Sequence, residues 1–220
     1  MEKDRTANKQ YYETFWQNPE ADFLHNPLAD RRRVEMVVSV LRKNNCQNIL
    51  DVGCGSGDLV RELCKNGFQA EGMDISEKAL EVARKMHPDG KYSFHIADQP
   101  GWPFADETID CVSMLEVLEH LFDLNVTVKE IYRVLKPGGI IIATVPYHGL
   151  IKNLAIALIN FDSHYDVNGA HIRFFTRKSL ARLFSKHQFN IVTDKIWLAG
   201  RLLPPATGIF FVAQKPGSVT

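Results

Sequence analysis

Several features that mark particular classes of protein are missing from this sequence. Among its 220 residues, 26 Lys and Arg balance 26 Asp and Glu, so no overall field draws the chain to nucleic acid. No apolar run approaches the roughly 20 residues that a membrane-spanning helix needs, and residues 1–8 are polar, unlike a signal peptide. We therefore expect no transmembrane segment, no nucleic-acid partner, and a soluble protein of the cytoplasm.

Cysteine is also scarce, and its spacing suggests no metal. The four residues Cys46, Cys54, Cys64 and Cys111 form no Cys-x-x-Cys pair and no cluster with histidine. Such pairs and clusters are typical of zinc sites and exchangeable disulfides, so we expect neither of these and no metal site. Thiols that stay reduced suit the cytosol.

What the sequence does have, from residue 48 onward, is an alternation of short apolar runs and segments with helical periodicity. The runs expected to form strands are, in chain order, residues 48–52, 69–73, 92–96, 109–114 and 140–145. Gly67, Ser76 and Thr176 stand where helix caps are expected. Strand–helix alternation with short connections predicts the doubly wound α/β class, a parallel sheet covered by helices on both faces.

The end of the chain breaks this alternation. Residues 190–197 and 208–213 are two strand-like runs with no helix between them, joined by a loop at 202–207 that contains Pro204 and Pro205. We expect these two strands to pair antiparallel at one side of the sheet.

Residues 1–47 lie outside the repeat and are expected to form a helical cap on the main domain, residues 48–220. The apolar residues of the cap share one helical face: Val34, Val37, Val38 and Leu41.

The most informative stretch is Asp51-Val52-Gly53-Cys54-Gly55-Ser56-Gly57, which joins the first strand to its helix. Glycines at such a turn let the backbone approach a ligand closely, and helix N-terminal N–H groups face its polar atoms. The dinucleotide version, Gly-x-Gly-x-x-Gly, would need glycine where this sequence has Asp58. Carboxylates at positions 51 and 58 suit a ligand with ammonium and sulfonium groups better than a pyrophosphate. They therefore disfavour an NAD-dependent dehydrogenase.

A second acid, Asp74, ends the second strand, 23 positions after Asp51. In doubly wound sheets an acid at this position binds a ribose through its hydroxyls. The alternative interpretation of Asp74 is a charge at a helix N-terminus.

At these residues the chain resembles the class I S-adenosylmethionine-dependent methyltransferases, closely over residues 48–146 and more loosely at the terminal strand pair. The resemblance implies a Rossmann-like seven-stranded sheet in the order 3-2-1-4-5-7-6, with the last strand antiparallel, and S-adenosylmethionine as the cofactor. It also implies a set of cofactor-binding residues, namely Asp51, Gly53, Cys54, Gly55 and Gly57 around the methionine moiety, Asp74 at the ribose, Ile75, Asp98 and Gln99 at the adenine, and Leu115 and Glu116 after the fourth strand.

Within the class, Met114-Leu115-Glu116-Val117-Leu118-Glu119-His120 is similar to a segment of ubiquinone-pathway O-methyltransferases. His25-Asn26-Pro27-Leu28 is similar to the start of their cofactor-covering helix, where an arginine pairs with the cofactor carboxylate. In this chain arginines follow at positions 31–33, and Arg33 is the residue that we assign to that carboxylate.

Methyl transfer from a sulfonium is an in-line displacement, so the protein mainly has to align the acceptor and exclude water. The ligand is expected outside the carboxyl ends of the strands, which places residues 115–122 and 146–175 nearest the methyl group. A hydroxyl acceptor also needs a base, and the candidates are His120 and His148. The alternative for His120 is a helix-end histidine bonded to backbone, and for His148 a solvated loop residue.

A long insertion, residues 147–175, follows the fifth strand, and a connection of this length is usually functional or has its own structure. Its segment 149–161 has the periodicity of an apolar-faced helix. Such a helix would be a lid over an apolar acceptor, a contact to a membrane surface that holds the substrate, or plain packing. Three residues of the insertion are candidate substrate contacts: His164, Tyr165 and His171.

We expect methyl transfer to a small organic molecule, at oxygen rather than at nitrogen or carbon. Methylation of an RNA or protein acceptor is one alternative, disfavoured by the zero net charge and by the lack of an Asn-Pro-Pro-Tyr-like tetrapeptide after the fourth strand. A non-catalytic adenosylmethionine-binding subunit is another. The identity of the acceptor and the oligomeric state stay open at this point.

Overall fold

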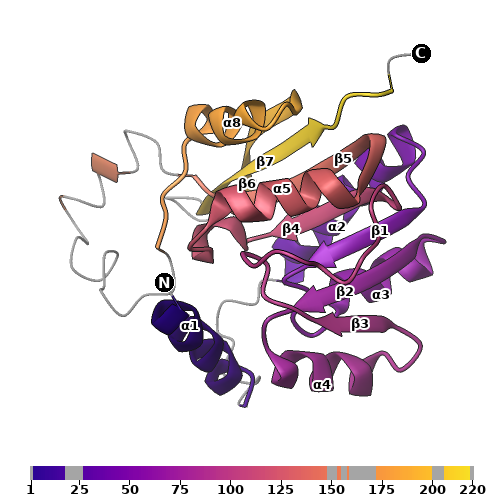
Figure 1. Ribbon diagram of the computed structural model, residues 1–220, viewed down its shortest axis with the longest axis vertical. Helices are drawn as coiled ribbons and strands as arrows, with labels where there is room; N and C mark the ends of the chain where they lie inside the picture. Colours follow the sequence, from indigo (N-terminus) through magenta and orange to yellow (C-terminus); the bar gives the residue numbers. More distant parts are fainter. Residues whose placement is uncertain are drawn as a thin grey trace.

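A seven-stranded sheet in the order β3-β2-β1-β4-β5-β7-β6 forms the centre of the computed structural model (Figure 1). The structure describes residues 2–17, 27–147, 153–154, 158, 172–199 and 206–218. The strands are β1 (Asn48–Val52), β2 (Gln69–Asp74), β3 (Lys91–Phe94), β4 (Ile109–Leu115), β5 (Leu135–Pro146), β6 (Asn190–Ala199) and β7 (Ala206–Gln214). The helices are α1 (Glu2–Phe15), α2 (Pro27–Lys43), α3 (Asp58–Lys65), α4 (Glu77–Met86), α5 (Leu124–Val134), α8 (Arg177–Lys186) and the short 3-10 helix η2 (Leu118–His120). The strand order expected from the sequence is confirmed.

The sheet is parallel from β3 to β5 and antiparallel beyond it. β1 pairs parallel with β2 and β4, and the same direction continues to β3 and β5, so the carboxyl ends of these strands meet at one edge. β7 pairs antiparallel with both β5 and β6, which confirms the antiparallel pair expected at the side of the sheet. Ile140, Ile141 and Ile142 of β5 are all buried, as a strand with helices on both faces requires.

Several strand boundaries differ from the expected ones; β3, for example, ends at Phe94 and not at residue 96. β5 begins five residues earlier, at Leu135, because Leu135 already pairs with Ile109 of β4 ahead of a register shift. β7 begins at Ala206, so the end of the segment expected as a loop is strand that pairs with β6. Residues 202–205 of that segment lie outside the described residues.

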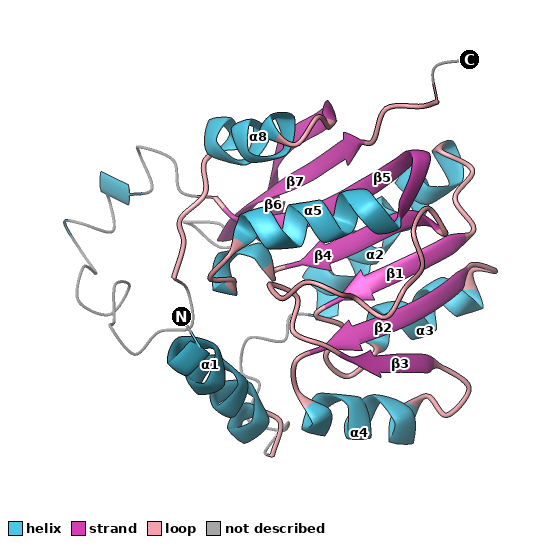
Figure 2. Ribbon diagram, viewed as in Figure 1, coloured by secondary structure: helices cyan, strands magenta, loops and turns pink. Residues whose placement is uncertain are grey.

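Helices cover both faces of the sheet (Figure 2). On one face, α2 buries Val37 and Leu41, and α3 buries Leu63. The apolar helical face predicted for the segment that includes Val37 and Leu41 is thereby confirmed. On the other face, α5 buries Ile131 and α8 buries Phe184. All five side chains are fully buried, and each such burial contributes roughly 1.5–3 kcal/mol to folding.

Helix caps lie where the sequence placed them. Ser76 Oγ accepts a hydrogen bond from the Ala79 N–H at 3.1 Å at the start of α4. Thr176 forms a reciprocal capping box with Ser179 at the start of α8, and Gly67 follows α3 with a φ of +88°. These side chains and this glycine satisfy backbone groups that a helix end leaves without partners.

α1 stands apart from the two helical layers and lies beyond the carboxyl ends of the parallel strands (Figure 1). Among the described residues, no helix is both long enough and apolar enough to cross a membrane. Of the insertion at 147–175, the structure describes the two ends and residues 153–154 and 158. The helix expected at 149–161 therefore lies largely outside the described residues.

Candidate functional site

The turn between β1 and α3 has left-handed backbone at three glycines. Gly53, Gly55 and Gly57 have φ angles of +74°, +51° and +77°, a region that favours glycine. A Cβ added at Gly53 would lie 2.5 Å from Val117 Cγ2, and one at Gly55 would lie 2.8 Å from the Trp16 ring. Conformation and close neighbours both require glycine here, so the turn presents bare backbone to its surroundings.

Asp74, at the end of β2, joins this turn to the start of α4. Its Oδ2 accepts a hydrogen bond from the Gly55 N–H and its Oδ1 one from the Ser76 N–H, both at 2.9 Å. The residue is 7% exposed, and burial raises its pKa although the backbone N–H groups oppose the shift. An ionised carboxylate offers about four acceptor sites, so Asp74 retains capacity for ligand hydroxyls.

Asp51, in β1, is the second buried acid of the site. Its Oδ1 accepts a hydrogen bond from Ser113 Oγ of β4 at 2.7 Å. Burial raises the pKa of Asp51 to about 7, and the hydrogen bond from Ser113 partly opposes that rise. A cation bound nearby would favour the ionised form of this carboxyl.

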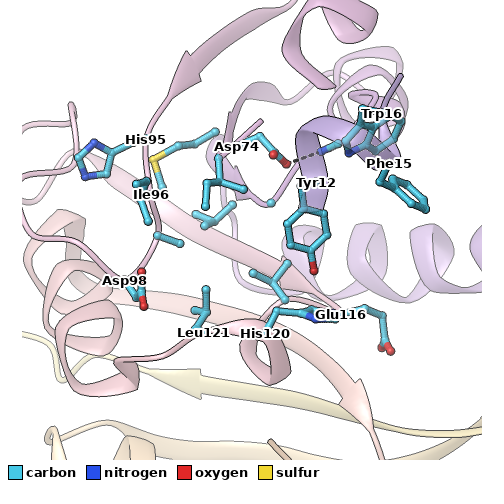
Figure 3. Close-up of a pocket in the computed structure, with 17 residues that line it drawn as sticks. Tyr12, Phe15, Trp16, Asp74, His95, Ile96, Asp98, Glu116, His120 and Leu121 are labelled. Carbon is cyan, nitrogen blue, oxygen red and sulfur yellow. Dashed lines mark hydrogen bonds between the residues drawn. The ribbon is translucent and has the colours of Figure 1, made fainter. Parts of the chain in front are cut away.

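A cavity of about 160 Å³ lies at the carboxyl ends of β1, β2 and β4, beside α1 (Figure 3). Its wall is mostly apolar. α1 contributes Tyr12 and Phe15 to it, and Trp16, directly after α1, also lines it. In Figure 3 the Tyr12 side chain points from α1 toward His120. The predicted cofactor residues that line this cavity are Gly53, Gly55, Asp74, Ile75, Asp98 and Glu116.

Asp98 lines the cavity next to Ile96 and is only 2% exposed. Its Oδ2 accepts hydrogen bonds from the Phe122 and Asp123 N–H groups, at 3.0 and 3.1 Å. The carboxylate therefore ties the loop after β3 to the start of α5 as well as facing the cavity.

A second cavity, of about 620 Å³, shares Gly53 with the first. The predicted cofactor residues that line it are Arg33, Asp51, Cys54 and Leu115. Arg61 and Asp58 also line it and pair at 3.2 Å, so this cavity is charged where the first is apolar. Gly53 belongs to the lining of both cavities. Gly57 and Gln99 are not among the described residues that line either cavity.

His120 ends η2 and lines the first cavity. Its backbone N–H donates to the Val117 carbonyl at 3.0 Å, and its ring meets the Tyr12 ring edge to face with centroids 5.9 Å apart. Its Nε2 lies 3.9 Å from Oε1 of Glu119. Glu119 is fully buried, and burial together with the neighbouring Glu116 carboxyl raises its pKa well above the ordinary value. The raised pKa favours the neutral form of Glu119.

Glu116 follows β4 directly and has a left-handed φ of +57°. Its N–H donates to the Thr144 carbonyl at 2.9 Å. Non-glycine residues held in this region commonly occur at functional sites, where the surrounding structure supports the strain. Among the described residues, no group of three or more His, Cys, Asp or Glu side chains is placed to hold a metal ion.

The aromatic wall supplied by α1 was not predicted. Tyr12, Phe15 and Trp16 are spaced i, i+3, i+4, which marks one helical face, but that spacing does not say which surface the face covers. The remaining predicted catalytic and substrate residues lie outside the described residues: His148, His164, Tyr165 and His171.

A family model described as "Methyltransferase domain" matches residues 14–194. Methyltransferase GfsG from Streptomyces halstedii is 32% identical over 153 residues, which are 66% of this chain and 54% of that protein. Ubiquinone biosynthesis O-methyltransferase from Bordetella avium is 33% identical over 131 residues, which are 56% and 53% of the two chains. The chain thus spans about half the length of these curated relatives.

The fold itself recurs in solved structures. Magnesium protoporphyrin IX methyltransferase (ChlM) from Synechocystis PCC 6803, solved with bound SAH, superposes with a TM-score of 0.70 over 96% of this chain and 99% of that one. The identity is 17%, so this likeness concerns the fold alone.

Proposed function

Since this chain belongs to the methyltransferase-domain family, whose cofactor is S-adenosylmethionine, we propose that it transfers the methyl group of that cofactor to an oxygen of a small organic molecule. The observation that carries the proposal is the pair of cavities that both have Gly53 in their walls. One cavity is apolar and has in its wall Asp74, the acid that we predict to bind a ribose; the other is lined by charged side chains. Their combined chemistry matches a ligand with an adenosine at one end and a charged amino acid at the other.

The residues present fit this cofactor. Asp74 has acceptor capacity for ribose hydroxyls, and Ile75 and Ile96 offer apolar walls for an adenine. In the other cavity, Asp51 is matched to cationic groups and Arg33 to a carboxylate. Gly57 and Gln99 are not among the described residues that line these two cavities, and their predicted roles stay proposals.

The bound cofactor supplies a methyl group that its sulfonium already activates. The contribution of the chain is to align the acceptor and exclude water, and the α1 side chains Tyr12 and Trp16 stand where they would exclude it. We assign His120 as the base that accepts the acceptor hydroxyl proton, because it lines the apolar cavity next to Tyr12.

Oxygen as the methylated atom is supported by relatives that are named as O-methyltransferases, including the Bordetella avium protein and one from Pyrenophora dematioidea. A small acceptor is supported by the zero net charge of the chain, which favours no polyanion. The cytoplasmic location stays a prediction, as does the division into a cap, residues 1–47, and a domain, residues 48–220. Val37 and Leu41 of that cap are already buried in the core of the domain.

The test is incubation with methyl-labelled adenosylmethionine and fractionated small metabolites, followed by mass spectrometry of the labelled product. We expect a labelled methyl ether or ester from the wild-type protein and none from Gly55→Val, which we expect to lose the cofactor. Label in RNA or protein fractions would favour the alternative acceptors. Cofactor binding with no label in any fraction would favour a non-catalytic subunit.

A further inference from the structure

We infer that Glu13 is a positioning residue, which holds α1 over the cofactor cavity by binding the N-terminus of α4. This inference rests on the proposed function, because it concerns the same cavity. Glu13 lies on α1 between Tyr12, which lines the cavity, and Trp16, which lines it one turn further on.

The carboxylate of Glu13 joins two helices that are far apart in the sequence. Its Oε1 accepts a hydrogen bond from the Glu77 N–H at 2.9 Å, and its Oε2 one from the Lys78 N–H at 3.2 Å. These are the first two N–H groups of α4, which have no partner within the helix. The next one, on Ala79, is taken by Ser76 Oγ. A carboxylate at this position is also stabilised by the helix dipole.

The same short segment carries the proposed ribose acid. Asp74 accepts from the Ser76 N–H with one oxygen and from the Gly55 N–H with the other. Residues 74–78 therefore connect the glycine turn to α1 through consecutive hydrogen bonds. We therefore expect a shift of α1 to change the position of Asp74 through these hydrogen bonds.

From this anchor, α1 and the turn after it make three other contacts, two of them with residues of the cavity wall. The Trp16 ring lies against Gly55, where an added Cβ would be 2.8 Å away. The Tyr12 ring meets His120 edge to face, and Lys9 Nζ lies 4.5 Å from the centre of the Phe94 ring. Burial raises the pKa of Tyr12, so its hydroxyl stays a hydrogen-bond donor to whatever occupies the cavity.

The expected consequence is that Glu13 controls cofactor retention without touching the cofactor. Loss of a helix-capping acceptor typically weakens a structure by an amount that corresponds to about fivefold in an equilibrium. We therefore expect Glu13→Ala to raise the Kd for adenosylhomocysteine about fivefold. Glu13→Gln, whose amide oxygen still accepts a hydrogen bond, should recover part of the loss.

The experiment combines calorimetry with hydrogen exchange of the α1 amides, measured on the whole chain with and without adenosylhomocysteine. Glu81→Ala is the matched control. Glu81 lies on the exposed side of α4 and pairs with Lys78. Among the described residues it forms no hydrogen bond or ion pair with α1. We expect Glu13→Ala to speed exchange of residues 2–17 in the free protein, to weaken binding, and to leave the exchange of β1 and β4 unchanged. KM for the cofactor should rise more than kcat falls.

Unchanged exchange of residues 2–17 in Glu13→Ala would overturn the inference, and so would faster exchange with wild-type affinity. The exchange measured in the free protein tests Glu13 even if the wild-type protein binds no adenosylhomocysteine. Failure of the wild-type protein to bind adenosylhomocysteine would instead overturn the proposed function, so the two failures are distinguishable.

Discussion

The two sides of the apolar cavity are built in different ways. Its floor, the turn at residues 51–57 together with Asp74, is held by backbone geometry and by a buried carboxylate on two N–H groups. Its cover, α1, is held by side chains near the surface, chiefly Glu13 on α4 and Tyr12 against His120. Contacts of the second kind open at lower free energy than a packed core does. We therefore expect that recognition of the cofactor, by the floor, and its retention, by the cover, can be changed separately.

Gly55→Val should have the largest effect on cofactor affinity, because it strains the backbone of the floor and also brings a side chain into contact with Trp16, next to the cover. Valine at a φ of +51° is strained, and its Cβ would lie 2.8 Å from Trp16. We expect the Kd for adenosylhomocysteine to rise on the order of 100-fold or more. Gly217→Val, at a position with no atom within 4 Å of an added Cβ, is the control. Equal affinity of the two variants would mean that the ligand does not approach this turn.

His120→Ala should come next and should act on turnover instead of on binding. His120 faces the cover through Tyr12 and is our candidate base, so we expect kcat to fall about 100-fold. Affinity for adenosylhomocysteine, measured by calorimetry, should change little. If turnover with the identified acceptor persists, His120 is not the base.

Asp74→Asn tests the floor alone. In the wild-type protein both carboxylate oxygens accept hydrogen bonds, from the N–H groups of Gly55 and Ser76. The substitution keeps one acceptor oxygen and replaces the other with an amide group. Hydrogen bonds to a charged group are the stronger kind, so we expect roughly a 10- to 100-fold rise in Kd for adenosylhomocysteine. Asp89→Asn, an exposed acid outside both cavities, is the control. A loss confined to protein stability, with affinity intact, would refute a ribose contact.

The pH dependence of binding should be a smaller effect than these three, and it reports on Asp51. Its pKa of about 7 means that roughly a tenth is ionised at pH 6 and roughly nine tenths at pH 8. Since the ionised form attracts the sulfonium and the ammonium, affinity for adenosylmethionine should rise up to about tenfold over this range, relative to Asp51→Asn. If the affinity of Asp51→Asn changed with pH in the same way as that of the wild-type protein, Asp51 would not face the cationic groups.

The floor could be predicted because its determinants are local in the sequence. The glycines at 53, 55 and 57 and the acid at the end of the next strand can be recognised from their positions in the sequence. The strand order followed from the family resemblance, and the terminal antiparallel pair from two runs without a helix between them. Strand ends were less predictable, since pairing across the sheet extended β5 back to Leu135.

The cover could not be predicted because it depends on tertiary contacts. Glu13 binds the N–H of Glu77, 64 positions away, and such a contact leaves no periodic pattern in the sequence. Asp98 is a similar case. Its place at the cavity was foreseen, whereas its bonds to Phe122 and Asp123, 24 and 25 positions away, were not.

Calorimetric titration of the wild-type protein with adenosylhomocysteine, and in parallel with NAD, tests the central claim most directly. The account predicts one site per chain for adenosylhomocysteine and no competition from NAD, because Asp58 stands where a dinucleotide-binding loop needs glycine. Failure to bind adenosylhomocysteine, or its displacement by NAD, would contradict it.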